Sequence, residues 1–129
     1  MQPLGNLTEL IYSATRLVVG FTFALHGAQK LFGVFDQDAV DLFSRLGLAG
    51  IVEFFGGALI SVGLYTPWVA FIASGEMAFA YFIVHSPRGL WPLANGGEAA
   101  VLYCFVFLYF ASRGSGPLSL DRIIRGQRS

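Results

Sequence analysis

Long apolar runs separated by short polar stretches dominate this sequence of 129 residues. A bilayer core about 30 Å thick requires roughly 20 mostly apolar residues in one helix. Four segments approach that length, and the last two are short enough to need tilt or local thinning of the bilayer. The expected spans are residues 11–31, 46–65, 68–84 and 97–112. The pattern therefore predicts an all-α polytopic membrane protein, a four-transmembrane-helix bundle that forms one domain over residues 1–129.

The alternative is a set of buried helices in a soluble bundle, which would show polar stripes at a spacing of about 3.6 residues. The run VLYCFVFLYF at 101–110 has no such stripe. Only 12% of the residues are charged, against about 25% in a soluble domain. The 8 basic and 8 acidic residues balance, and 55% of the chain is apolar. This composition excludes a disordered chain and a basic nucleic-acid binder, and predicts contact with the lipid bilayer.

An even number of spans places both termini on one side of the membrane. That side would carry most of the arginines, whereas Lys30, Arg45 and Arg88 belong to the other side. The residues on the terminal side are Arg16, Arg113, Arg122, Arg125 and Arg128. The positive-inside rule then predicts that both termini are cytoplasmic. Residues 1–10 lack a basic start and contain Glu9, so we expect the first apolar segment to stay in the mature protein.

Ionisable residues inside the expected spans are the main chemical signal, since a charge at the bilayer centre costs at least about 2.5–3.5 kcal/mol. With a helical rise of about 1.5 Å per residue, His26, Glu53 and Glu76 lie roughly 8–12 Å below one surface. Lys30 and Glu98 lie nearer to that same surface, which carries the Asp-rich connection after the first span. Arg16 is the exception, since it lies near the opposite surface and could snorkel toward it.

These residues predict a polar pocket for a ligand or for protons in one half of the bundle. Its main candidates are His26, Lys30, Glu53, Glu76 and Glu98, and its secondary candidates are Arg16, Gln29, His85 and Asn95. No catalytic residue is assigned. Small residues let helices approach closely, and the candidates for such packing are Gly27, Gly56 and Gly57.

A purely structural interpretation stays open, in which Glu53 pairs with Lys30 or His26 to fix the helix register. Three carboxyls face one lysine and one histidine, so at least one carboxyl is expected to be neutral or to share a proton. The single cysteine, Cys104, excludes an intrachain disulfide and a Cys-based metal site. A haem between His26 and His85 is geometrically conceivable, but the sequence contains no metal or haem motif.

Several segments, taken in order, resemble the DoxX family of small four-helix membrane proteins. They are Arg16, HGAQKLFG at 26–33, EFFGGALISVGLYTP at 53–67, Glu76, NGGEAAVLY at 95–103 and GPLSLDRII at 116–124. The resemblance implies a bacterial or archaeal cytoplasmic membrane. It also implies a link to quinone chemistry, because a related subunit belongs to an archaeal thiosulfate:quinone oxidoreductase and another member is linked to a membrane oxidoreductase complex. By this analogy Lys30 and His26 would donate hydrogen bonds to a quinone, and the three glutamates would relay protons.

Three functional hypotheses follow. The chain is a membrane subunit of a quinone-linked oxidoreductase, a non-catalytic scaffold for other proteins, or a carrier of a small solute or proton. In the second hypothesis the basic tail DRIIRGQRS at 121–129 would bind a protein or anionic lipid. Four short helices leave broad apolar faces, so a protein partner or a homo-oligomer is expected.

Overall fold

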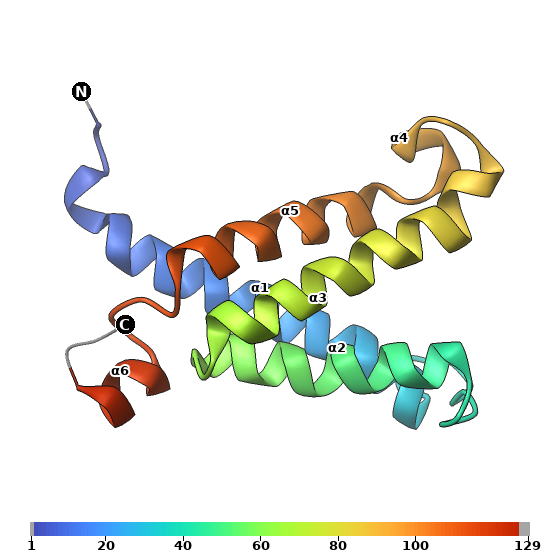
Figure 1. Cartoon of the computed structure of the whole chain (residues 1–129), viewed down its shortest axis with the longest axis horizontal. Helices are drawn as coiled ribbons and strands as arrows, with labels where there is room; N and C mark the ends of the chain where they lie inside the picture. The colour runs from blue at the N-terminus through green and yellow to red at the C-terminus, as the bar shows by residue number, and fades with distance from the viewer. Residues whose placement is uncertain (1, 127–129) are drawn as a thin grey trace.

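The computed structural model describes residues 2–126, and within that range the chain is helical and has no strand. Four long helices run alternately up and down (Figure 1). They are α1 (Thr8–Phe32), α2 (Arg45–Val62), α3 (Thr66–Ala80) and α5 (Glu98–Arg113). A π-helical turn (Tyr81–His85) and a 3-10 turn (Ser86–Arg88) extend α3. The short elements are a 3-10 turn (Gly5–Leu7), α4 (Pro92–Asn95) and α6 (Leu120–Arg125).

The helices agree closely with the expected apolar segments. The second segment, predicted for 46–65, ends earlier, at Val62, because Gly63 adopts the left-handed conformation (φ 75°) that terminates a helix. The next helix starts at Thr66 with Pro67 in its first turn, a position where proline needs no partner for its missing N–H. Residues 127–129, which include Arg128 of the predicted basic tail, lie outside the described residues.

Two helical stretches within the described residues, Arg45–Val62 and Thr66–Arg88, are long and apolar enough to cross a membrane. The outer faces of the long helices also expose large apolar side chains, including Phe21, Phe71 and Phe105. An apolar exterior of this extent is typical of contact with lipid.

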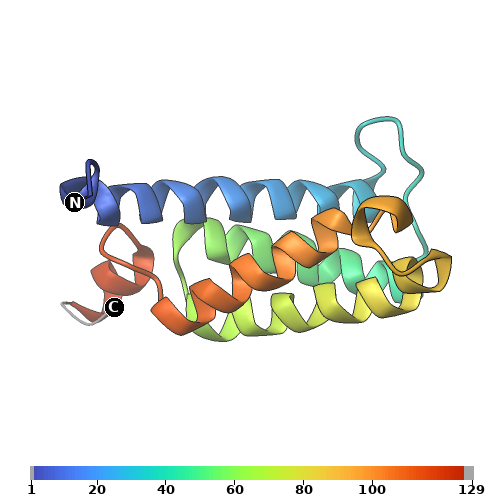
Figure 2. The same cartoon turned by 90° about the horizontal axis from the view of Figure 1, so that it is seen from above.

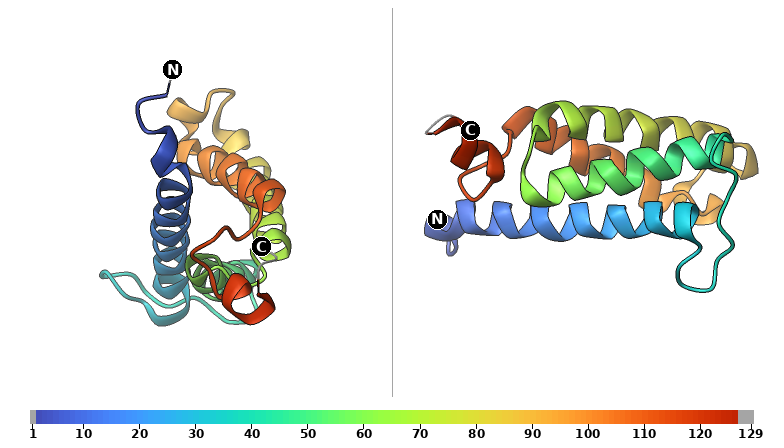
Figure 3. Two further views of the ribbon diagram at one scale, coloured as in Figure 1. Left: turned by 90° about the vertical axis from the view of Figure 1, so that its left-hand side faces the viewer. Right: turned by 90° about the horizontal axis from the view of Figure 1, so that it is seen from below.

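The closest helix packing joins α1 to α2, which lie side by side in Figure 3. A Cβ atom on Gly27 would stand 2.1 Å from the backbone nitrogen of Phe54, and one on Gly57 would stand 2.4 Å from that of Ala24. Gly20 and Gly27 are seven residues apart, as are Gly50 and Gly57. The spacing keeps these glycines on the facing sides of the two helices, so the backbones touch.

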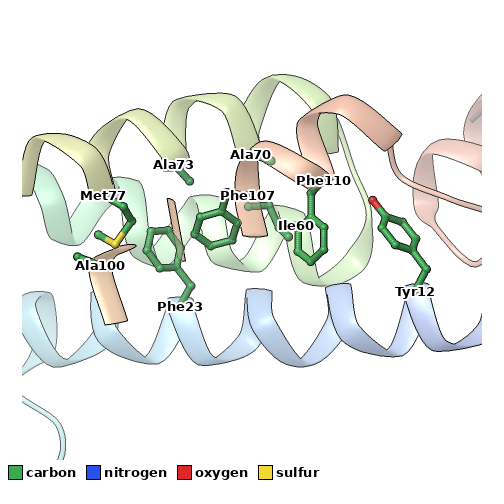
Figure 4. Close-up of a cluster of buried hydrophobic side chains, with 9 residues drawn as sticks. All are labelled: Tyr12, Phe23, Ile60, Ala70, Ala73, Met77, Ala100, Phe107 and Phe110. Atoms are coloured by element: carbon green, nitrogen blue, oxygen red, sulfur yellow. The ribbon is translucent and has the colours of Figure 1, made fainter. Parts of the chain in front are cut away.

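Aromatic side chains, by contrast, fill the space between α1 and α5. Phe23 of α1 meets Phe107 of α5 with ring centroids 4.6 Å apart, and Tyr12 meets Phe110 at 5.6 Å. These rings belong to a buried cluster that extends along the bundle axis (Figure 4). The α1–α2 pair therefore packs backbone to backbone, whereas α5 is held to α1 by side chains.

The end of the bundle that carries α6 is organised around Arg16, which is only 3% exposed. Its guanidinium donates to the carbonyl oxygens of Ile60 (3.0 Å) and Leu118 (2.7 Å), and also to that of Ser115. Arg16 is therefore buried instead of snorkelling, which the sequence had left open. It binds carbonyls at the C-terminal end of α2, where a helix lacks internal partners and favours a cation.

The segment that folds over Arg16, residues 114–125, is called the C-terminal clasp here, and it lies beside the start of α1 (Figure 2). Tyr12 donates to the Gly114 oxygen (2.6 Å), and the backbone N–H of Asp121 donates to the Gly63 oxygen (3.0 Å). Ser115 donates to the Asp121 carboxylate (2.5 Å). The clasp thus ties the chain's C-terminal part to α1 and to the turn between α2 and α3.

The glycine contact gives a direct test. Gly27→Ala is expected to lower the free energy of unfolding by about 1–3 kcal/mol, because its methyl group would overlap the backbone of α2. Gly75→Ala is the matched control, since a Cβ on Gly75 has no neighbour within 4 Å. The control is expected to be neutral or to stabilise by about 0.5–1 kcal/mol. Unfolding of both variants in the same detergent measures the difference, and equal stabilities would contradict the close packing.

The clasp predicts a pH dependence. Burial of the Asp121 carboxyl opposes its ionisation, but the hydrogen bond from Ser115, the N–H of Tyr65 and the charge of Arg125 together hold its pKa below the ordinary value. A lowered folded-state pKa stabilises the fold above the unfolded pKa of about 3.9 and loses that contribution as pH falls toward the folded value.

Asp121→Asn is therefore expected to reduce the loss of thermal stability between about pH 5 and pH 3. Asp38→Asn, in the exposed connection before α2, is the control and should leave that pH profile unchanged. The test measures melting temperatures of the three proteins across this pH range. Parallel plots of melting temperature against pH for the wild type and Asp121→Asn would exclude a role of Asp121 in holding the clasp.

Candidate functional site

The opposite end of the bundle contains an ion pair between α1 and α2. The Lys30 ammonium donates to Glu53 Oε1 at 2.7 Å, and the two side chains are 25% and 3% exposed. Lys30 lies one helical turn beyond Gly27, whose contact with Phe54 places it beside the turn that carries Glu53. The glycine packing of the two helices therefore brings the backbones that carry this pair close together.

A cavity of about 260 Å³ opens beside the pair, between the four long helices. Its polar lining consists of His26, Lys30, Glu53, Glu76, His85 and Tyr103. We call this cavity the polar pocket. It brings together four of the five main candidates from the sequence, together with the secondary candidate His85.

Glu76 of α3 is the least satisfied member of the polar pocket. Its Oε1 atom is buried and has no hydrogen-bond partner among the described residues. Its carboxyl lies near enough to interact with both Glu53 and Lys30. Two carboxyls thus face a single ammonium, and full ionisation would leave one negative charge uncompensated in a largely apolar surrounding.

His26 and Tyr103 form the edge of the polar pocket between α1 and α5. Their rings meet edge to face with centroids 5.9 Å apart, and the His26 side chain is exposed. The sequence analysis did not single out Tyr103. The sequence does contain a pattern that could have identified it. Ala100, Tyr103 and Phe107 are spaced three and four residues apart, as on the inward face of a helix.

That spacing also explains the position of Glu98, which is exposed and does not line the polar pocket. Glu98 precedes Tyr103 by five residues, so it lies roughly 140° away around the helix. Gln29 is half-buried and is not part of the lining. Arg16 is at the other end of the bundle, where the clasp folds over it.

Asn95 has a structural role beside the polar pocket rather than inside it. Its amide donates to Tyr81 Oη and to the Gly89 oxygen, both at 3.0 Å, and its side-chain oxygen accepts from the Gly97 N–H at 2.8 Å. The Asn95 backbone oxygen is 3.4 Å from His85 Nδ1. Asn95 therefore orders the connection between α3 and α5 and holds His85 at the rim.

The predicted packing glycines have different surroundings. Gly27 and Gly57 both touch backbone across the α1–α2 contact. Gly56 faces α3 more loosely, since a Cβ there would lie 3.6 Å from Val69 Cγ1. Among the described residues, no group of three or more His, Cys, Asp or Glu side chains is arranged to hold a metal ion.

Comparison with known proteins finds a family model and a relative that match this chain. The family model named DoxX matches residues 11–86. A protein of Haemophilus influenzae described as "Uncharacterized protein" is 42% identical, and the match covers 94% of this chain and 96% of that protein. No solved structure matches.

The ion pair can be tested by a double-mutant cycle. Glu53→Gln and Lys30→Met are each expected to destabilise the protein, by less than the about 3–5 kcal/mol of a fully buried pair because Lys30 is partly exposed. The double variant should lose less than the sum of the two single changes.

The control for this cycle is the pair between Glu9 and Arg113, near the start of α1 and the end of α5. Glu9 is more than half exposed, so Glu9→Gln should cost no more than about 1 kcal/mol. Free energies of unfolding are measured for all variants in the same detergent. If the effects of Lys30→Met and Glu53→Gln simply add in the double variant, the contact between the two side chains contributes nothing to stability.

Proposed function

This chain belongs to the DoxX family of membrane proteins, and we propose that it is a subunit of a quinone-linked oxidoreductase complex whose polar pocket binds the quinone ring. The observation that carries the proposal is the incomplete pairing in the polar pocket. A purely structural ion pair needs one carboxyl, whereas this cavity contains a second carboxyl with a buried, unpartnered oxygen.

The proposed arrangement in the membrane has four spans. At about 1.5 Å per residue, α1 is roughly 37 Å long and crosses a bilayer core of about 30 Å, whereas α5 is roughly 24 Å long and needs local thinning. Both termini are proposed to be cytoplasmic. The polar pocket then lies in the outer half of a bacterial or archaeal cytoplasmic membrane.

The donors and acceptors of the polar pocket suit a quinone. Reduction of a quinone to the quinol takes up two electrons and two protons. The Lys30 ammonium has three N–H groups, and within residues 2–126 its hydrogen bond is to Glu53, so the other two can bind a ligand carbonyl. Glu76 Oε1 is available to accept from a ligand hydroxyl, and Glu53 and Glu76 together can hold and deliver a proton.

Proton supply from the outside would pass His85, which lines the polar pocket beside the connection between α3 and α5. Electrons must come from a partner protein, because the sequence contains no redox-cofactor motif. The proposed complex therefore pairs this membrane subunit with a second protein that carries the electron-transfer group.

Quinone binding to the purified protein in lipid nanodiscs tests the proposal. A benzoquinone ring without a tail is expected to bind the wild type, and Glu76→Gln is expected to weaken binding about tenfold, equivalent to about 1.4 kcal/mol. Glu98→Gln is the matched control, since Glu98 is exposed and does not line the polar pocket. Absence of binding to the wild type, or equal losses for the two variants, would count against the proposal.

The scaffold hypothesis is favoured by a different observation. The clasp holds α6 in place while Ile123 and Ile124 are 77% and 67% exposed. A fixed apolar surface of this kind suits a protein partner. Ile123→Ser combined with Ile124→Ser should then release partners while leaving quinone binding intact, whereas Glu76→Gln should do the reverse.

A further inference from the structure

A second cavity lies on the outside of the bundle, between α2 and the helical stretch formed by α3 and its π-helical extension. Its volume is about 460 Å³, and apart from Arg45 and Glu76 its lining is apolar. Leu48 and Val52 form one side, and Phe79 and Ile83 form the other. We call it the outer groove. Figure 1 shows how α2 and α3 diverge from the turn at 63–65 toward the end where this groove lies.

The outer groove and the polar pocket share part of their walls. Leu46 and Ala49 of α2 line both cavities, as do Ala80 and Val84 on the opposite side. Ala49 and Ala80 are small, so the boundary between the two cavities is thin. A ligand therefore has a short path from the lipid-facing side of the molecule into the polar pocket.

Glu76 is the polar side chain common to both cavities. Its buried Oε1 atom, which has no partner among the described residues, lies at the boundary between the apolar groove and the Lys30–Glu53 pair. A carboxyl in this position suits a ligand that has a polar group at one end and an apolar chain behind it.

We propose that the outer groove is a lateral entrance from the bilayer, in which the apolar tail of a lipid-soluble quinone lies while its ring occupies the polar pocket; this rests on the proposed function. The sizes of the two cavities support this placement of the ring in the polar pocket and the tail in the outer groove. The polar pocket, at about 260 Å³, is below the range of about 300–1,000 Å³ that is usual for ligand sites, so it admits a ring but not a long tail. The outer groove, at about 460 Å³ and with a mostly apolar lining, provides the surface along which the tail can lie.

The main variant fills the outer groove and leaves the lining of the polar pocket unchanged. Val52 lines only the groove, and Val62 on the same helix is exposed and lines neither cavity. Val52→Trp is compared with its matched control Val62→Trp in nanodiscs. A second pair, Ala49→Phe and Ala58→Phe, blocks the boundary itself, with exposed Ala58 as the control.

Two probes are titrated against each protein: a benzoquinone with a long isoprenoid tail and the same ring without a tail. Val52→Trp is expected to weaken binding of the tailed quinone about tenfold and to leave binding of the tail-less ring within about twofold of the wild type. Ala49→Phe should also weaken the tailed quinone, whereas Val62→Trp and Ala58→Phe should change neither probe.

Several results would overturn this inference. Equal affinity of Val52→Trp and Val62→Trp for the tailed quinone would exclude the groove as its binding site while leaving the proposed function intact. Displacement of a copurified phospholipid by Val52→Trp, without loss of quinone affinity, would identify the groove's occupant as membrane lipid instead. If neither probe binds the wild type, the proposed function fails and the entrance fails with it.

Discussion

Contact between the backbones of α1 and α2 is the constraint on which the rest of the structure depends. In lipid, apolar side chains gain little by leaving their surroundings, so helices associate through close packing and polar contacts. Gly27 and Gly57 remove the side chains that would keep the two helices apart. The register set in this way determines the contacts at both ends, placing Lys30 beside Glu53 at one end and Arg16 beside the last carbonyls of α2 at the other.

The two ends differ in how their cations are paired. The Arg16 guanidinium donates to several backbone carbonyls from α2 and the clasp. Within residues 2–126, unpartnered buried oxygens also occur at that end, on Asp121 and on the hydroxyls of Ser13 and Thr66. Lys30 donates to one carboxyl and retains part of its exposure, while the neighbouring carboxyl of Glu76 keeps a buried oxygen without a partner among the described residues. Buried polar groups normally find partners, and the unpartnered oxygen of Glu76 belongs to a side chain that lines a cavity next to a partly exposed ammonium. A ligand in that cavity would supply the missing partner.

The sequence predicted the helices well because apolar runs and a few turn residues determine where they begin and end. It also brought His26, Lys30, Glu53 and Glu76 together, since depth along a span follows from residue count. It did not assign Arg16 correctly, because the carbonyls that bind Arg16 include those of Ser115 and Leu118, about a hundred residues away. Glu98 and Tyr103 show a second limit: depth alone does not tell which face of α5 turns inward, and only the stripe through Ala100 and Phe107 does.

The unequal packing of the helices bears on how the polar pocket works. Lys30 and Glu53 belong to helices whose backbones touch, so the distance between the backbones that carry them is set by the glycine contact. Glu76 belongs to α3, which meets α2 through ordinary side-chain contacts such as that of Val69 with Gly56. A small shift of α3 against the α1–α2 pair would change the position of one carboxyl relative to the ion pair, and it would change the width of the boundary at Ala49 and Ala80. Under the proposed entrance, a movement that admitted a ligand from the bilayer would therefore also alter the electrostatic surroundings of Glu76, because both depend on the same helix.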